Sequence, residues 1–253
     1  MSADAYLYGI LAREAVDTGA RSPVLSVLGV LEPFVQRWAG DKLLSMTPSG
    51  SFAKGTPNRS GTDIDLFISL SPQTNENLSQ IYEALFSYLS ANGFKPKRQN
   101  VSINVRVSGA YDVDLVPAKR QNMMNFDHSL YRRRAETWTK TNVQTHINHV
   151  QTGGRQMETR ILKLWRTQKG IELPSFYLEL TAIDALRSYH GTISQNVWRV
   201  FQYLSASFVG ARVVDPANTN NIISDDLTVA EKNQVRAAAA SALQAKSWDE
   251  IVR

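Results

Sequence analysis

Four aspartates lie in two short segments that have the alternating pattern of strands. Asp63 and Asp65 head an apolar run, and Asp112 and Asp114 alternate with apolar residues in the segment 111–117. Because side chains alternate along a strand, each pair shares one face, and pairing of the two strands would gather three or four carboxylates. Clustered carboxylate oxygens suit Mg²⁺, and two such ions can promote an in-line displacement at phosphorus. The pattern therefore indicates metal-dependent nucleotide transfer.

A glycine-serine pair precedes these aspartates and could supply the other half of such a site. Gly50 permits close approach of the backbone to a phosphate, and Ser51 adds a hydroxyl donor. Residues 52–56 are compatible with one helical turn, whose free amides attract anions. No Gly-Lys-Ser/Thr follows at the Walker spacing. A lone Gly-Ser is usually a turn and a lone Asp-x-Asp a solvated strand end, so the two are informative only in combination.

The segments that would position these residues are both helical and extended. Periodicity predicts helices over residues 3–17, 23–39 and 77–91 and strands over 43–49, 63–70, 101–107 and 111–117. The last two strands would form a hairpin. After Pro117 no further convincing long strand is predicted, and helical patterns dominate from residue 142, at 156–169, 176–189 and 229–245. We expect an α+β fold, with a small mixed sheet and flanking helices over 1–135 and a helical lobe over 136–253.

Three segments, in this order, resemble the active-site pattern of the DNA polymerase β superfamily of nucleotidyltransferases. They are Gly-Ser-Phe-Ala-Lys-Gly-Thr at 50–56, Gly-Thr-Asp-Ile-Asp-Leu at 61–66 and Tyr-Asp-Val-Asp-Leu-Val-Pro at 111–117. Within that superfamily the chain is similar to oligoadenylate synthetases, cyclic GMP-AMP synthase and bacterial cyclic-oligonucleotide synthases, and to archaeal-type CCA-adding enzymes. The resemblance implies a polymerase β-like fold and transfer of a nucleoside monophosphate from a triphosphate to a ribose hydroxyl, with release of pyrophosphate.

The resemblance also implies roles for the carboxylates. Asp63 and Asp65 would hold both metals, and Asp114 would bind the catalytic metal and help to deprotonate the acceptor hydroxyl. Asp112 has no role in the pattern and is interpreted as a neighbour. The metals implied are two Mg²⁺ ions, with Mn²⁺ as an alternative.

Further roles are implied in the expected helical lobe. Residues 160–165 and 173–180 are similar to helices of the oligoadenylate and cyclic-oligonucleotide synthases. There a lysine on the first helix contacts the donor triphosphate and a serine before the second often does likewise, which assigns these roles to Lys163 and Ser175. A surface lysine is the plain alternative for Lys163. Tyr177 could stack on the donor base, although an aromatic residue near a helix start is at least as often part of a core.

The composition excludes some kinds of site and indicates where the protein is located. The 253 residues include 28 Lys and Arg against 23 Asp and Glu, and no cysteine. Without cysteine, disulfides, thiolate zinc sites and a cysteine nucleophile are excluded, which fits a reducing compartment. Because the chain has no stretch of 18 apolar residues and no signal-peptide pattern, we expect a cytoplasmic protein without a membrane segment. The densest basic cluster, Arg132, Arg133 and Arg134, is either a solvated face or a contact for RNA or another polyanion.

Three functions compete on the sequence alone. The first is synthesis of a cyclic or linear oligonucleotide second messenger from nucleoside triphosphates, as in anti-phage-type signalling, with a regulatory protein as a further partner. The Asp-Pro-Ala-Asn segment at 215–218 favours this branch because it resembles one in oligoadenylate-type synthases. The second is nucleotide addition to an RNA 3′ end, as CCA-adding enzymes perform. The third is an inactive scaffold that binds nucleotides or RNA, against which the intact Asp63, Asp65 and Asp114 argue.

Overall fold

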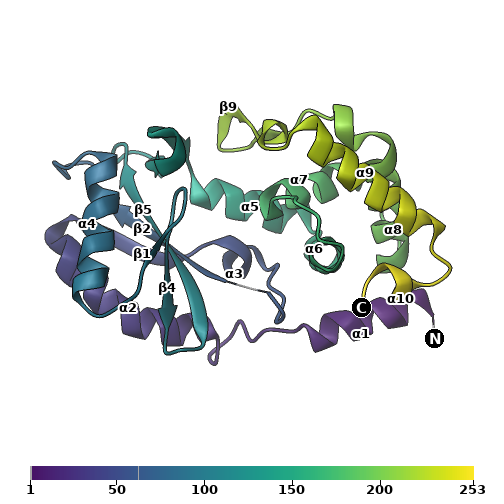
Figure 1. Cartoon of the computed structure of the whole chain (residues 1–253), viewed down its shortest axis with the longest axis horizontal. Coiled ribbons are helices and arrows are strands. Elements are labelled where there is room, and N and C mark those ends of the chain that lie inside the picture. Colours follow the sequence, from purple (N-terminus) through teal and green to yellow (C-terminus); the bar gives the residue numbers. More distant parts are fainter. Residues whose placement is uncertain (1, 62) are drawn as a thin grey trace. The chain divides into compact units, whose positions relative to one another are not determined.

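The computed structural model describes residues 2–61 and 63–253, which form two compact units (Figure 1). The sheet unit comprises residues 16–54 and 61–147, and the helical unit comprises residues 1–15, 55–60 and 148–253. These units differ in two places from the division predicted at residue 135. Helix α1 (Ala3–Arg13) belongs to the helical unit because Leu7 and Ile10 are buried in that unit's core. Strand β7 (Thr137–Thr141) pairs within the sheet.

The sheet unit contains a seven-stranded mixed sheet. Its strands are β1 (Leu43–Pro48), β2 (Ile64–Leu70), β3 (Lys97–Arg98), β4 (Ile103–Val107), β5 (Tyr111–Arg120), β6 (His128–Arg132) and β7. The strand order is β1-β2-β5-β4-β3, and β6 and β7 extend the sheet from the end of β5. Strands β2 and β5 are parallel, and the other paired strands are antiparallel. The parallel pair therefore aligns the two acidic segments.

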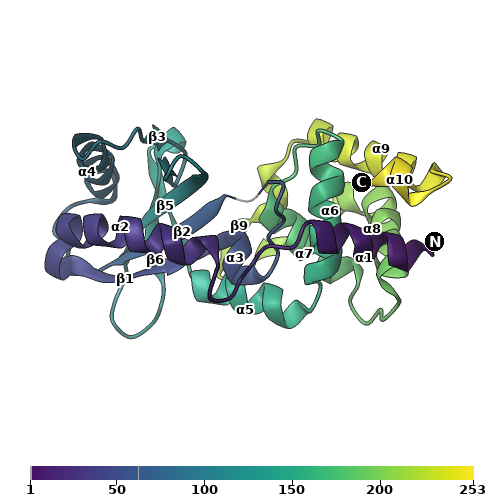
Figure 2. The same ribbon diagram turned by 90° about the horizontal axis from the view of Figure 1, so that it is seen from below.

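One face of the sheet carries the main hydrophobic core of this unit. Helices α2 (Pro23–Ala39) and α4 (Leu78–Ala91) lie against it (Figures 1 and 2). Alternate strand residues, such as Leu66 on β2 and Leu115 on β5, are fully buried in this core. Because side chains alternate, the intervening residues point to the opposite face. That face carries a smaller hydrophobic cluster around Phe67 and, next to it along the strands, the aspartates.

The helical unit packs its helices around aromatic and aliphatic side chains. Besides α1 it contains α6 (Gln156–Gln168), α7 (Ser175–Ala185), α8 (Ile193–Ala206), α9 (Val229–Gln244), α10 (Trp248–Ile251) and the hairpin of β8 (Val214–Asp215) with β9 (Asn218–Ile222), and α5 (Val143–Gly153) enters it from the sheet unit. Trp165 on α6 meets Phe201 on α8 with ring centroids 5.0 Å apart. Figure 2 shows α1 alongside α6 and α8. The two chain ends meet where Tyr6 Oη donates to the Val252 carbonyl at 3.0 Å.

The predicted elements before residue 117 are confirmed, with shifted ends. The first helix stops at Arg13, and the hairpin of β4 with β5 has the predicted pairing. The expectation of no further long strand after Pro117 is wrong, since β5 continues to Arg120 and β6 and β7 follow. Only one of the five residues of β7 is buried. Its sequence therefore has no apolar alternation from which the strand could be predicted.

None of the helices in the described part of the chain combines the length and the hydropathy that a bilayer crossing requires. The cytoplasmic location stays a prediction.

Candidate active site

Strand register places two of the aspartates directly opposite each other. In the parallel pair of β2 and β5, Asp65 is the partner of Asp114, and Asn104 on β4 is the partner of Asp114 on its other side. The three residues form a row across neighbouring strands, on the face opposite the main core. Asp63 immediately precedes β2 and shares the face of Asp65 by alternation. The predicted pairing of the two acidic segments is confirmed.

These carboxylates interact electrostatically. Desolvation among neighbouring protein atoms raises the pKa of Asp63, and the charge of Asp112 raises it further. Burial also raises the pKa of Asp114, with smaller contributions from the charges of Asp63 and Asp112, while a hydrogen bond from Asn104 opposes the shift. Like charges held close together disfavour ionisation of both partners. The arrangement therefore concentrates negative charge at a cost in folding free energy.

The aspartate side chains do not form a preorganised metal-binding site. Within residues 2–61 and 63–253, no three His, Asp or Glu side chains form a group that could hold a metal ion as they stand. Strand register fixes the order of the aspartates, whereas the torsions of their short side chains set the separation of the carboxylates. Joint binding of an ion would therefore require these carboxylates to change their positions.

The glycine-serine turn lies against the second aspartate. The Ser49 amide donates to the Asp65 carbonyl at 2.8 Å, and α3 (Gly50–Lys54) begins immediately afterwards with Ser51 half-buried. Gly50 has φ +55°, and a Cβ there would lie 1.7 Å from Asp65 Oδ2. The absence of a side chain at Gly50 thus makes room for the Asp65 carboxylate, a role that adds to the predicted approach of a phosphate. Thr62, part of the quoted motif, lies outside the described residues.

Two amide side chains that sequence analysis missed hold the third aspartate. Gln99 Nε2 and Asn104 Nδ2 both donate to Asp114 Oδ1, at 3.1 and 2.9 Å. Asn104 could have been found, because the predicted hairpin of 101–107 with 111–117 places it across from Asp114. Gln99 lies outside the strands, between β3 and β4, and no periodic pattern marks it.

We expect Asp63→Asn to stabilise the protein in a chelator at neutral pH. A carboxyl whose folded pKa is raised binds its proton more tightly in the folded state, so stability falls as pH rises from 3.8 through the folded pKa. At pH 7 that loss is complete, and the amide removes it, so we expect a gain in Tm over the wild type. Thermal unfolding at a series of pH values measures it: the gain should shrink towards pH 3.8, and a lower Tm at pH 7 would contradict the electrostatic account.

The residues expected to contact the donor nucleotide from the second lobe all lie in the helical unit. Lys163 on α6 is buried, which excludes the alternative interpretation of Lys163 as a surface lysine. Its Nζ donates to Glu179 Oε1 at 2.8 Å and to Thr56 Oγ1 at 2.9 Å, and Thr56 Oγ1 donates to the same Glu179 oxygen at 2.9 Å. A phosphate would have to share or displace these partners, so the triphosphate role of Lys163 stays a prediction.

Ser175 and Tyr177 occupy the start of α7 in different environments. Ser175 is exposed as the first residue of the helix, and its Oγ accepts from Arg166 Nη1 at 2.9 Å. Tyr177 is fully buried, with its ring centroid 5.0 Å from that of Phe208, and burial raises its pKa to about 12. The expectation that Tyr177 stacks on a base is corrected, since its ring belongs to the core. Phe176, half-buried, is the aromatic residue with exposed surface at this helix start.

We expect Glu179→Ala to destabilise the helical unit strongly. The substitution leaves the Lys163 ammonium buried without its carboxylate, which costs about 3–5 kcal/mol. Denaturant unfolding measures the loss. The double variant Lys163→Met with Glu179→Leu removes both charges and should recover most of the stability. A loss below about 1 kcal/mol in the single variant would show that the Lys163–Glu179 pair behaves like a solvent-exposed ion pair.

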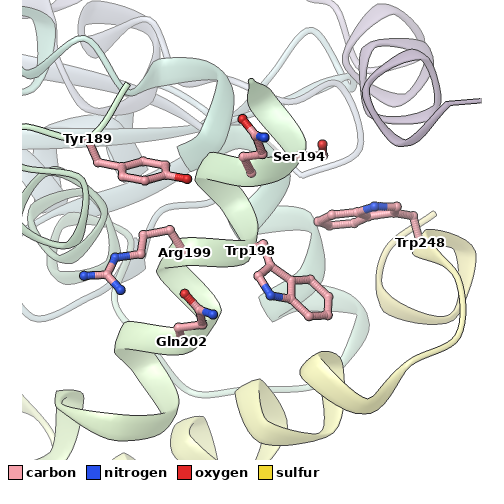
Figure 3. A pocket seen from close by; sticks show the side chains of 7 residues that line it. Tyr189, Ser194, Trp198, Arg199, Gln202 and Trp248 are labelled. Atoms are coloured by element: carbon pink, nitrogen blue, oxygen red, sulfur yellow. The ribbon is translucent and has the colours of Figure 1, made fainter. Parts of the chain in front are cut away.

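The helical unit also has a groove that contains none of the candidate residues. It has a volume of about 350 Å³ and lies along α8 next to the start of α10 (Figure 3). Trp198 and Trp248 meet there at 6.2 Å between ring centroids, with Arg199 and Gln202 further along α8. Its lining has no carboxylate.

Comparison with solved structures identifies the fold as that of the polymerase β-like nucleotidyltransferases, which confirms the predicted fold class. Escherichia coli MS115-1 CdnC with ATP is 20% identical with a TM-score of 0.80, covering 96% of this chain and 91% of that one. The Bradyrhizobium diazoefficiens CD-NTase CdnG with GTP is 13% identical with a TM-score of 0.75, covering 98% and 94%. The Cid1 poly(U) polymerase bound to MgATP is 11% identical with a TM-score of 0.70, covering 95% and 93%.

Sequence comparison adds one curated relative. The cyclic AMP-AMP-AMP synthase of Escherichia coli (strain MS 115-1) is 26% identical over 170 residues, which are 62% of this chain and 53% of the synthase. The match therefore spans about half the length of that relative. No protein-family model matches the chain. The likeness to CCA-adding enzymes stays a prediction.

Proposed function

We propose that the chain is a divalent-metal-dependent nucleotidyltransferase that joins nucleoside triphosphates into a cyclic or linear oligonucleotide signal. The observation that carries this proposal is the pairing of Asp65 with Asp114 across β2 and β5, with the Gly50 turn packed on the Asp65 carboxylate. The polymerase β-like fold supports the reaction type. Similarity to a cyclic AMP-AMP-AMP synthase, and to CdnC with ATP and CdnG with GTP, supports the product class.

The residues fit the metals that the fold implies. Asp63, Asp65 and Asp114 offer carboxylate oxygens, the donors that Mg²⁺ and Mn²⁺ prefer. Gly50 has no side chain, and a Cβ at that position would overlap the Asp65 carboxylate. We propose that these three aspartates hold two Mg²⁺ ions. Bound there, the ions neutralise charge on the phosphates and lower the pKa of the attacking hydroxyl.

The chain's own residues would position the reactants and move the proton. Ser51 donates a hydrogen bond to a donor phosphate. The phosphate contacts of Lys163 and Ser175 stay predictions of the family resemblance. Asp114 accepts the proton of the acceptor ribose hydroxyl. The hydroxyl oxygen then attacks the α-phosphorus, and pyrophosphate leaves. Positioning and charge stabilisation supply the rate, since no residue forms a covalent intermediate.

A second function is favoured by a particular comparison. The Cid1 poly(U) polymerase shares the fold over nearly the whole chain, so nucleotide addition to an RNA 3′ end uses a closely related architecture. The polyanion expected at Arg132, Arg133 and Arg134 would then be the RNA. A regulatory protein partner is also proposed, because CdnC has been seen in a complex with HORMA-deltaN.

Incubation with labelled nucleotides tests the proposal. The purified protein is mixed with each labelled triphosphate and Mg²⁺ or Mn²⁺, with and without transfer RNA, and the products are treated with phosphatase. We expect label in a small phosphatase-resistant product. Label in RNA would establish the second function instead, and no incorporation under any condition would refute transferase activity.

A further inference from the structure

We propose that Arg133 is a positioning residue that acts through Gln99 on Asp114, rather than only one charge of a basic surface cluster. The inference rests on the proposed function, because Asp114 is taken to be the carboxylate that receives the proton. It gives a specific role to one member of the arginine cluster. All the residues involved lie in the sheet unit.

The two amides that hold Asp114 are not fixed in the same way. Asn104 lies on β4, directly across from Asp114, so the hairpin sets its position. Gln99 lies between β3 and β4, which are paired through residues 97–98 and 103–104, and its position depends on how the residues 99–102 are fastened. We call these four residues the Gln99 loop. The Gln99 loop is closed by a hydrogen bond from the Gln99 amide to the Ser102 carbonyl at 3.0 Å, and contacts from outside the loop fasten it further.

Arg133 fastens the Gln99 loop at two points. Its Nε donates to the Gln99 carbonyl at 3.1 Å, and its backbone amide donates to the Asn100 carbonyl at 2.8 Å. The hydroxyl of the buried Tyr82 lies 3.0 Å from the same Gln99 carbonyl oxygen and 2.8 Å from the Ser102 carbonyl oxygen, so its one proton is shared between the two acceptors. These bonds tie the backbone of the Gln99 loop to α4 and to the turn after β6. The Arg133 guanidinium is thus part of the frame that places the loop.

The side chain of Gln99 connects the fastened loop to Asp114. Its Oε1 accepts from Ser102 Oγ at 2.7 Å, which orients the amide so that Nε2 points at Asp114 Oδ1. With Asn104, Gln99 gives this oxygen two donors, and two donors to one oxygen fix the plane of the carboxylate.

Arg134 provides a matched control. It has the same charge, is adjacent in sequence and is more exposed than Arg133. Its contact with the Gln99 loop is made by its backbone amide, which donates to Asn100 Oδ1 at 3.1 Å. Replacing the Arg134 side chain therefore removes one positive charge and keeps that hydrogen bond. A general electrostatic role would make the two arginines equivalent, whereas a positioning role separates them.

The test compares Arg133→Gln with Arg134→Gln in the full chain by two readouts. Nucleotide transfer is followed with labelled triphosphate in the absence of RNA, and Mn²⁺ affinity is measured by electron paramagnetic resonance of the free ion. We expect Arg133→Gln to lower kcat about tenfold and to weaken Mn²⁺ binding several-fold, with Arg134→Gln within about twofold of wild type in both. Arg133→Lys, which keeps a donor, should recover part of the loss.

A second variant guards against a simple folding defect. Gln99→Leu removes the amide directly and should reproduce the losses, and adding Arg133→Gln to it should cost little more, because both act on one contact. Equal effects of Arg133→Gln and Arg134→Gln, or additive losses in the double variant, would overturn the positioning role while leaving the proposed function intact. An inactive wild type that still binds Mn²⁺ would refute the function alone, and absence of Mn²⁺ binding would overturn both.

Discussion

Asp65→Asn is expected to lower kcat/KM for nucleotidyl transfer by roughly 10³-fold, with little change in the free energy of unfolding. Asp65 lies opposite Asp114 in the strand register and beside the Gly50 turn, so it joins the two halves of the site. The amide keeps the shape of the side chain but loses the negative charge that would bind a divalent ion. Steady-state kinetics with saturating Mg²⁺ measure the effect.

Asp112→Asn is the control for this prediction. Asp112 is exposed, lies on the same strand as Asp114, and contributes to the raised pKa values of Asp63 and Asp114. Removing it changes the local charge by the same amount but takes away no proposed ligand. Activity within about threefold of wild type is expected for Asp112→Asn. Equal losses in the two variants would show that total charge, rather than metal ligation, matters at this position.

Gly50→Ala is expected to abolish activity and to lower stability by about 2–4 kcal/mol. The new Cβ would lie 1.7 Å from Asp65 Oδ2 and 2.4 Å from its Cγ, so the carboxylate or the turn must move. The backbone at φ +55° adds strain of about 1–2 kcal/mol for a residue with a side chain. Kinetics and denaturant unfolding of the same preparation measure the two effects.

Gly93→Ala separates backbone strain from the clash. Gly93 follows α4 in the same unit with φ +85°, and a Cβ there would meet no heavy atom within 4 Å. This variant should lose about 1 kcal/mol of stability and keep its activity. If Gly50→Ala also kept near-normal activity, Asp65 could move freely, and the fixed turn would not be part of the site.

The row formed by Asp65 and Asp114 could be predicted because both segments follow the two-residue period of a strand. Leu66 and Leu115, which are fully buried, fix which face each strand turns to the core, so Asp65 and Asp114 had to emerge on the other. Asn104 follows from the same logic through the predicted hairpin. What the sequence did not predict was that the carboxylates do not form a preformed metal group, since side-chain torsions are not encoded by periodicity.

Residues outside regular strands were harder to predict. Gln99 reaches Asp114 only because the Gln99 loop is fastened by Tyr82 and Arg133, and Arg133 is separated from it by 34 residues of sequence. Tyr177 was placed at a helix start correctly, but which side of α7 faces the core depends on Phe208 and other distant side chains. The place of residues 1–15 in the helical unit could not be predicted for the same reason, because α1 packs with helices far along the chain.

The most direct test is a crystal structure with Mn²⁺ and a non-hydrolysable nucleoside triphosphate, with the ions located by anomalous scattering. We expect Mn²⁺ bound by the carboxylates of Asp63, Asp65 and Asp114, with the phosphates contacting Ser51. Mn²⁺ bound by other side chains, or a triphosphate held away from the Gly50 turn, would contradict the assignment of this site.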